Sequence, residues 1–299
     1  MGNLITLDDF TKGEILDLIT LAKDIKSNPR KYAKAMDGRV LAMIFEKPSL
    51  RTRVSFEAGM SKMGGSVIFL SKGDIQLGRG ETVEDTARVT SRYVDIMMAR
   101  VFEYSTIEEL AENATVPVIN GLTNINHPCQ ILGDLLTVSE KLGKVEGIKV
   151  AFLGDCSNNT CNSWATVAPK LGIELCCGFP EGYGPSESVL KKSKRYKLTQ
   201  DPKAAVRGAD MVYTDTWMSM HIVEDERAKR LADLDDYRVT KDLMKLAKPK
   251  AIFMHCLPAH RGEEMTAEVI DGPQSVVLDQ AENRMWMQDA IMLKLLKLA

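Results

Sequence analysis

The chain contains 299 residues, of which 44% are hydrophobic and 27% are charged, and its formal net charge is −2 at pH 7. This size and composition are typical of a globular protein with two domains of ordinary size. The balanced charge argues against a nucleic-acid or membrane partner, and no apolar run approaches the roughly 20 residues that span a bilayer. Because the first residues also lack a targeting pattern, we expect a cytoplasmic protein.

Apolar runs alternate with segments of helical period along the whole chain. Thr11 and Glu14 form a capping box that predicts a first helix, and further helices are expected after Ser49 and over residues 81–93, 128–142 and 282–298. The predicted strands cover residues 40–45, 67–70, 96–101, 116–119, 150–153, 173–177, 211–214, 252–255 and 276–278. Repeated β–α order with strands rich in Val, Ile, Leu and Met predicts an α/β protein. Its parallel sheets would carry helices on both faces.

A domain boundary is expected near residue 140, where a helix ends at Gly143 and a new strand follows. We therefore predict one α/β domain over residues 1–142 and a second over residues 143–280. The last segment, residues 281–299, reads as an amphipathic helix that closes either domain or packs across both.

The six cysteines include no pair with the C-x-x-C spacing of zinc or redox sites. Reduced thiols in an intracellular protein fit this pattern better than a disulfide framework does. Cys176 and Cys177 lie inside an apolar run, which predicts buried and unreactive thiols.

The first predicted strand is followed at once by Ser49, Arg51, Thr52 and Arg53. Free N–H groups at a helix N-terminus bind anions, and arginine grips phosphate in a bidentate manner. This turn therefore predicts an anion site. The alternative is an exposed basic turn, although cations there oppose the helix dipole.

Further polar clusters come directly after other predicted strands or open helices, and ligands of open α/β sheets bind at the carboxyl ends of strands. Each cluster alone also has a structural interpretation, as an ion pair, a helix cap or a core residue. His255, Cys256 and His260 lack the spacing of a structural zinc site, and no G-x-G-x-x-G motif points to a dinucleotide. The clusters contain Arg100; His127 and Gln130; Gly154–Asn159; Asp215 and Ser219; His255–His260; and Arg284.

In this order, the clusters closely resemble the motifs of the aspartate/ornithine carbamoyltransferase family. The resemblance rests on Ser49-Leu50-Arg51-Thr52-Arg53, His127-Pro128-Cys129-Gln130, Asp215–Met220 and His255-Cys256-Leu257-Pro258. Residues 75–82 are similar to the mobile loop of that family. The motif His255-Cys256-Leu257-Pro258 is of the ornithine type. The resemblance runs from about residue 5 to residue 295.

The resemblance implies transfer of a carbamoyl group from carbamoyl phosphate to the neutral δ-amine of ornithine, giving citrulline and phosphate. Its catalytic residues would be Arg51, Thr52, Arg100, His127 and Cys256. Carbamoyl phosphate would be held by Ser49, Leu50, Arg51, Thr52, Gln76, Arg100, His127, Gln130 and Arg284, together with the Cys256 and Leu257 carbonyls. Ornithine would be held by Asn159, Asp215, Ser219 and Met220. The family implies no metal, no cofactor, and a homotrimer or an assembly of trimers in which Gln76 reaches across the interface.

Two departures from the family pattern concern the acceptor amine. The turn Gly154–Asn159 is one residue longer than usual, and His221 stands where ornithine enzymes usually carry glycine. A carbamoyltransferase for putrescine or a modified ornithine is therefore the alternative. An aspartate enzyme is disfavoured because its Arg-x-Gln-x-Glu-Arg loop is missing between Trp217 and Arg227. The intact arginine set disfavours a catalytically dead relative. The missing glycine fingerprint, together with the anion-binding arginines, disfavours a dehydrogenase. The direction of the reaction in the cell stays open.

Overall fold

A computed structural model describes residues 2–73, 80–191, 196–219 and 222–299 of the chain. It divides the chain into two compact units. Unit 1 comprises Met1–Leu136 and Glu282–Ala299, and unit 2 comprises Thr137–Ala281. Each unit contains one parallel sheet. The predicted α/β class with two parallel sheets is thus confirmed.

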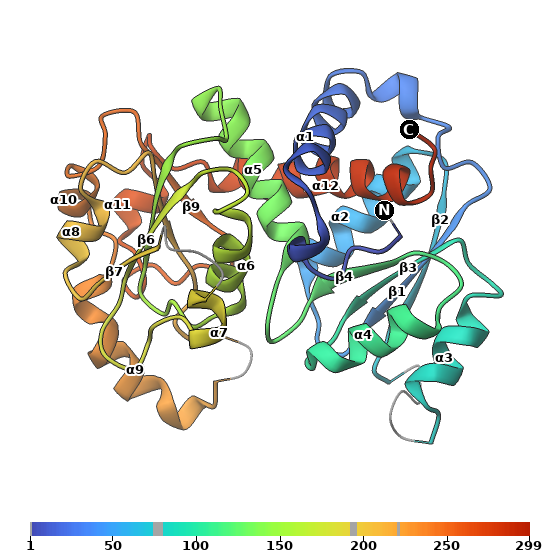
Figure 1. Ribbon diagram of the computed structural model, residues 1–299, viewed down its shortest axis with the longest axis horizontal. Coiled ribbons are helices and arrows are strands. Elements are labelled where there is room, and N and C mark those ends of the chain that lie inside the picture. The colour runs from blue at the N-terminus through green and yellow to red at the C-terminus, as the bar shows by residue number, and fades with distance from the viewer. Residues whose placement is uncertain (1, 74–79, 192–195, 220–221) are drawn as a thin grey trace. The chain divides into compact units, whose positions relative to one another are not determined.

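The sheet of unit 1 has the strand order β2-β1-β3-β4, and its pairs are all parallel. Helices α1, α2 and α12 (Val277–Leu295) lie on one side of this sheet, and α3 and α4 lie on the other (Figure 1). The strands are β1 Val40–Phe45, β2 Ser66–Ser71, β3 Ile96–Arg100 and β4 Val118–Leu122. The helices are α1 Lys12–Ser27, α2 Leu50–Lys62, α3 Val83–Thr90, α4 Tyr104–Asn113 and α5 Pro128–Leu142, whose last turns belong to unit 2.

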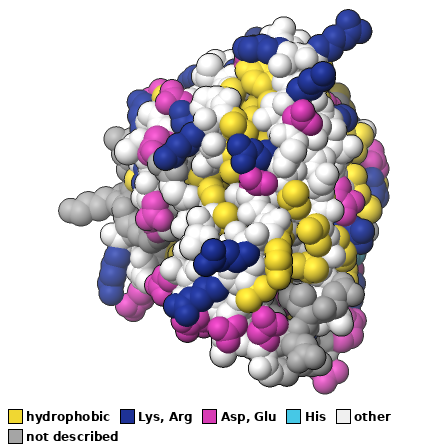
Figure 2. Space-filling view, turned by 90° about the vertical axis from the view of Figure 1, so that its right-hand side faces the viewer, with side chains coloured by type: hydrophobic (Ala, Val, Ile, Leu, Met, Phe, Trp, Pro, Cys, Tyr) yellow, Lys and Arg dark blue, Asp and Glu magenta, His cyan; other side chains and the backbone are white. Residues whose placement is uncertain are grey.

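Unit 1 exposes several large hydrophobic side chains. Hydrophobic side chains are gathered among charged ones on the face shown in Figure 2. In unit 1 the exposed large hydrophobic residues include Val54, Ile68 and Tyr93.

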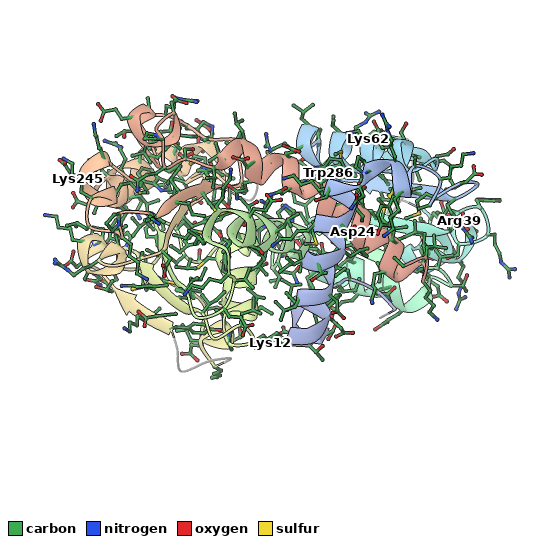
Figure 3. The ribbon with its side chains drawn as sticks, turned by 90° about the horizontal axis from the view of Figure 1, so that it is seen from above. Lys12, Asp24, Arg39, Lys62, Lys245 and Trp286 are labelled. Carbon is green, nitrogen blue, oxygen red and sulfur yellow. The ribbon has the colours of Figure 1, made fainter. Side chains whose placement is uncertain are left out.

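Lys62 of α2 lies over the ring of Trp286 in α12, with its Nζ 5.2 Å from the ring centroid (Figure 3). Helices α2 and α12 are therefore neighbours on one side of the sheet.

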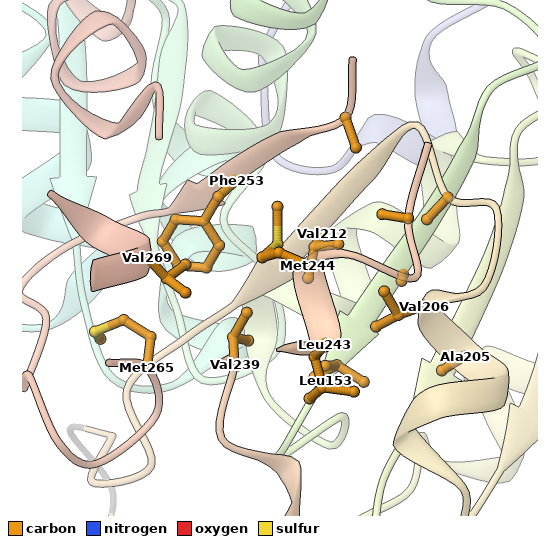
Figure 4. Packing of buried hydrophobic residues seen from close by; sticks show 14 of the residues in the cluster. Leu153, Ala205, Val206, Val212, Val239, Leu243, Met244, Phe253, Met265 and Val269 are labelled. Atoms are coloured by element: carbon orange, nitrogen blue, oxygen red, sulfur yellow. The ribbon is translucent and has the colours of Figure 1, made fainter. Parts of the chain in front are cut away.

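The sheet of unit 2 has the order β7-β6-β5-β8-β9, again with all pairs parallel. One face is covered by α8, α10 and α11, whose apolar residues pack on Leu153, Val212 and Phe253 (Figure 4). The strands are β5 Lys149–Leu153, β6 Glu174–Gly178, β7 Tyr196–Thr199, β8 Met211–Thr214 and β9 Ile252–His255. The helices are α6 Asn159–Val167, α7 Glu187–Leu190, α8 Pro202–Val206, α9 Arg227–Leu234, α10 Lys241–Met244 and α11 Ala267–Ile270, followed by the first turn of α12, whose remaining turns belong to unit 1.

Two sequence predictions about strands differ from the structure. The strand predicted at residues 276–278 is wrong, because Val277 opens α12 and only Ser275 makes an isolated bridge to Phe253. Leu278 is 77% exposed on that helix, although its apolar character suggested a buried strand. Strand β7 was missed because it lies at the edge of the sheet. Its residues, Tyr-Lys-Leu-Thr, are half-buried or exposed and form no apolar run.

Several local predictions are confirmed. The capping box at Thr11 and Glu14 starts α1, and Ser49 is the N-cap of α2. All six cysteines are free, and Cys176 and Cys177 are buried. Across the part of the chain that the structure describes, no helix is both long enough and apolar enough to cross a membrane.

Candidate functional site

In unit 1, the turn after β1 leads directly into the N-terminus of α2. The Ser49 hydroxyl accepts the Thr52 N–H at 3.4 Å and donates to Thr52 Oγ1 at 3.1 Å. Leu50 is the first residue of α2, and its side chain is 73% exposed. The side chains of Ser49 and Thr52 are thus fixed at a helix end whose N–H groups suit an anion.

Arg284 reaches this turn from α12. Its Nη2 donates to Thr52 Oγ1 at 2.9 Å, although the two residues are 232 positions apart in the sequence. Arg284 is only 3% exposed. Gly133 of α5 lies against it, since a Cβ at Gly133 would stand 3.3 Å from Arg284 Cγ. The guanidinium is therefore held in place by packing as well as by a hydrogen bond.

Three arginines surround His127 in unit 1. Burial, and then the positive charges of Arg284, Arg100 and Arg51, hold the pKa of His127 well below its usual range. The imidazole is therefore neutral at physiological pH, beside a concentration of fixed positive charge. Arg284 and His127 are buried, whereas Arg51 and Arg100 are half-buried. A cationic cluster of this kind suits a phosphate and an oxyanion, because positive charges fixed by the fold stabilise negative charge as it develops.

Arg100 of this cluster lies on β3, and Gln130 lies beside the cluster on α5. Arg100 ends β3, where the register with β4 shifts between Ala99 and Arg100. Gln130 lies in the first turn of α5 and is 1% exposed, and its Nε2 donates to Asp134 Oδ1 at 2.8 Å. Arg53, which the sequence also suggested for anion binding, points elsewhere. Its Nε donates to Glu57 at 2.9 Å, and its guanidinium lies 3.7 Å from the centroid of the Phe69 ring.

In unit 2, the turn between β5 and α6 separates the roles of two asparagines. Asn158 is the N-cap of α6, and its side chain accepts the Cys161 N–H at 2.8 Å. Asn159 is the first helical residue, and its Oδ1 accepts from the Thr160 hydroxyl at 3.3 Å. Gly154 opens the turn with φ +100°, and a Cβ there would stand 2.7 Å from Nε1 of Trp217. Only glycine fits this position.

A buried ion pair joins this turn to the loop after β8. Arg230 of α9 donates to the Asp155 carboxylate, and its Nε donates to the Trp217 carbonyl at 2.8 Å. Arg230 is 8% exposed and Asp155 is 5% exposed. Arg230 thus fixes both polar segments of unit 2. Sequence reasoning missed this residue, because the exposed helical face around it looks like an ordinary charged surface.

Asp215 and Cys256 meet at the ends of β8 and β9. The Cys256 thiol donates to Asp215 Oδ1 at 2.8 Å, and the Thr216 N–H donates to the same oxygen at 2.7 Å. Ser219 lies half-buried in the loop after Asp215. Gln76, Met220 and His221 lie outside the described residues.

The loop that carries Cys256 and Leu257 is built on a buried histidine and a buried carboxylate. His255 Nε2 pairs with Glu264 Oε1 at 3.0 Å, and His255 Nδ1 accepts the Leu257 N–H at 2.9 Å. The same Glu264 oxygen accepts the His260 N–H at 2.7 Å, and Leu257 has φ +57°. Both His255 nitrogens are thus engaged, although His255 lies within metal-ligand distance of Asp215 and Cys256. Sequence reasoning missed Glu264, since Gly262-Glu263-Glu264 reads as a solvated turn.

Two family models match almost the whole chain. Residues 2–140 match "Aspartate/ornithine carbamoyltransferase, carbamoyl-P binding domain", and residues 146–295 match "Aspartate/ornithine carbamoyltransferase, Asp/Orn binding domain". The chain belongs to the aspartate/ornithine carbamoyltransferase family. The resemblance read from the sequence motifs is thereby confirmed.

Members of this family with the name ornithine carbamoyltransferase are similar to the chain over nearly its full length. The protein of Cenarchaeum symbiosum is 50% identical, with 98% of this chain and 97% of that protein covered. The protein of Listeria monocytogenes is 46% identical over 99% of this chain and 96% of that protein. Among solved structures, ornithine carbamoyltransferase from Pyrococcus furiosus aligns with a TM-score of 0.93 at 47% identity, covering 98% of this chain and 96% of that one.

Proposed function

We propose that this chain transfers the carbamoyl group of carbamoyl phosphate to the δ-amine of L-ornithine, giving L-citrulline and phosphate. The observation that carries this proposal is the cluster of Arg51, Arg100 and Arg284 around a buried, neutral His127. Such a cluster suits a small dianion with a reactive carbonyl. The names of the similar proteins support ornithine as the acceptor rather than putrescine or a modified ornithine.

In the proposed reaction, the phosphate group binds at the N-terminus of α2. The Ser49 hydroxyl and the N–H groups of Leu50 and Thr52 would donate to its oxygens, which leaves the Thr52 hydroxyl for the carbonyl oxygen, while Arg51 and Arg284 neutralise the charge of the phosphate. Gln76 and Gln130 would add amide donors. The leaving phosphate is then already neutralised when the carbon–oxygen bond breaks, which lowers the barrier without a covalent intermediate.

The carbonyl carbon of carbamoyl phosphate is the site of attack. Arg100, Thr52 and neutral His127 would donate to the oxygen as negative charge develops on it. The carbonyls of Cys256 and Leu257 would accept from the carbamoyl NH₂ group. The buried Glu264–His255 pair supports this role, because it fixes the backbone of the loop through the Leu257 N–H.

Ornithine would bind to the polar segments of unit 2. Asp215 and Ser219 would take its α-ammonium, while Asn159 and the Met220 N–H would take its α-carboxylate. Since Asn158 is committed to capping α6, Asn159 is the asparagine of this turn that we assign to the ligand. The Cys256 thiol, which donates to Asp215, would lie beside the attacking amine. Only the uncharged amine reacts, so the rate should rise with pH.

We further propose a cytoplasmic homotrimer, or an assembly of trimers. The hydrophobic side chains exposed in unit 1, Val54, Ile68 and Tyr93 among them, support an interface between copies of the chain. Gln76 would contribute across that interface. Sedimentation of the purified protein tests this part, and a stable monomer that turns over would refute it.

An amine panel tests the proposed activity. The purified protein is mixed with carbamoyl phosphate and with ornithine, putrescine, aspartate or lysine, and the carbamoylated products are separated by chromatography. We expect citrulline as the principal product. Turnover of putrescine without citrulline would reject ornithine as the acceptor.

The two arginines of the first turn give a matched pair of variants. Arg51→Gln should lower kcat/KM by at least about 100-fold, because a donor to the transition state is lost. Arg53→Gln removes the same charge two residues away and, among the described residues, affects the contacts with Glu57 and Phe69, so it should retain most activity. Equal losses in the two variants would contradict the assignment of Arg51 to phosphate.

A further inference from the structure

Three thiols that the proposed reaction does not use lie together in unit 2. Cys156 belongs to the turn after β5, Cys161 to the first turn of α6, and Cys177 to β6. Their sulfur atoms all lie within 4.8 Å of one another, and the Cys161 and Cys177 sulfurs are 3.8 Å apart. None of the three residues is more than 1% exposed.

Strand alternation and a helix cap bring these three side chains together. Side chains alternate across a strand, so Cys176 and Cys177 face opposite sides of β6. Cys176 belongs to the core cluster that α8, α10 and α11 cover, which leaves Cys177 on the face with α6. The cap by Asn158 fixes the first turn of α6 and with it the position of Cys161.

The spacing of the sulfurs suits coordination of one metal ion. A zinc–sulfur bond is about 2.3 Å, so two thiolates in a tetrahedral shell stand about 3.8 Å apart. Soft thiolate ligands select ions such as Cu⁺ and Zn²⁺. The 3.8 Å between the Cys161 and Cys177 sulfurs therefore matches the spacing of two thiolates on one ion.

We propose that Cys156, Cys161 and Cys177 form a binding site for one soft, thiophilic metal ion, which the three sulfur atoms hold. Binding forms three metal–sulfur bonds, and the thiol protons pass to solvent without any change of oxidation state. The site is separate from the Asp215–Cys256 pair. Because Cys156 and Cys161 flank Asn158 and Asn159, a bound ion would also fix the turn between β5 and α6.

The test counts sulfur neighbours of a metal bound to the reduced wild-type protein. Cu⁺ is added under anaerobic conditions in one arm and Cd²⁺ in another, so that the arms distinguish a monovalent from a divalent soft ion. X-ray absorption then gives the ligand set. We expect one tightly bound equivalent of at least one ion, with three sulfur neighbours. No tight binding of either ion, or an ion with a single sulfur neighbour as at Cys256, would overturn the proposal.

Two serine variants localise the site. Cys177→Ser should raise the Kd of the bound ion by at least about 100-fold, since loss of a ligand exceeds the loss of an outer-shell partner. Cys176→Ser, the matched control at the adjacent residue, should leave the Kd unchanged. Equal weakening in both variants would count against the site, and if Cys177→Ser does not fold, the wild-type sulfur count decides. No step of this test needs catalytic turnover, so its failure is distinct from failure of the proposed function.

Discussion

Replacement of Asp289 by asparagine should stabilise the protein at alkaline pH. Asp289 lies on α12 and is 1% exposed, and a Cβ on Gly59 of α2 would stand 1.9 Å from its Oδ1. Among the residues that the structure describes, neither carboxylate oxygen has a hydrogen-bond partner. Burial raises the pKa of Asp289 from 3.8 to about 8, and the nearby charge of Lys62 offsets only part of this effect.

The sign and size of the effect follow from this pKa. The folded state holds the proton more tightly than the unfolded state, so the stabilising contribution is complete below about pH 4 and is lost as the pH rises to about 8. One pH unit between these limits is worth about 1.4 kcal/mol, so ionised Asp289 lowers the free energy of unfolding by up to about 6 kcal/mol. Asparagine has the same shape but does not ionise. We therefore expect Asp289→Asn to gain about 2–5 kcal/mol at pH 8.5 and only about 1 kcal/mol at pH 5.

Urea unfolding at pH 5, 7 and 8.5 measures this difference. Protein concentration must be held constant, because assembly changes apparent stability. Asp17→Asn is the matched control, since it removes the same charge at an exposed position of α1. The gain for Asp289→Asn over wild type should grow with pH, whereas the control should show no such trend. A pH-independent difference between Asp289→Asn and wild type would refute the argument that Asp289 is buried without compensation.

Three further predictions concern groups that surround the ligands. The pKa of His127 lies well below its usual range, so its imidazole does not titrate near neutral pH. His127→Gln should therefore lower the rate by about 100-fold, while the rate of the variant still rises with pH above about pH 6. Loss of this pH dependence of the rate in the variant would contradict a neutral imidazole. Glu264→Gln should raise the KM for carbamoyl phosphate more than the KM for ornithine, because the loop at His255 loses its carboxylate partner. Steady-state kinetics at matched pH measures both KM values. A change in the KM for ornithine alone would contradict this role of Glu264. Arg230→Met should destabilise the protein by about 3–5 kcal/mol in urea unfolding, since the Asp155 carboxylate stays buried without its cation, and unchanged stability would reject that role.

Much of the local structure could be predicted from residues near one another in the chain. The Ser49 cap, the Thr11–Glu14 box and the central strands depend on side chains within a few positions, and short-range chemistry decides them. The position of polar clusters after strands was predictable for the same reason. Edge strand β7 and the apolar start of α12 were not, because an exposed strand and a helix with one apolar turn lack a distinctive pattern.

The chain alone determined which chemical groups are available, and its motifs also indicated the family. The tertiary structure decided which of these groups act together. Arg51 and Arg53 look equivalent in the sequence, yet packing turns Arg53 to Glu57 and Phe69. Arg284 meets Thr52 across 232 positions, and Glu264 becomes a buried anchor for His255. Burial and long-range contacts set these roles, and they arise only when the sheets and helices have packed.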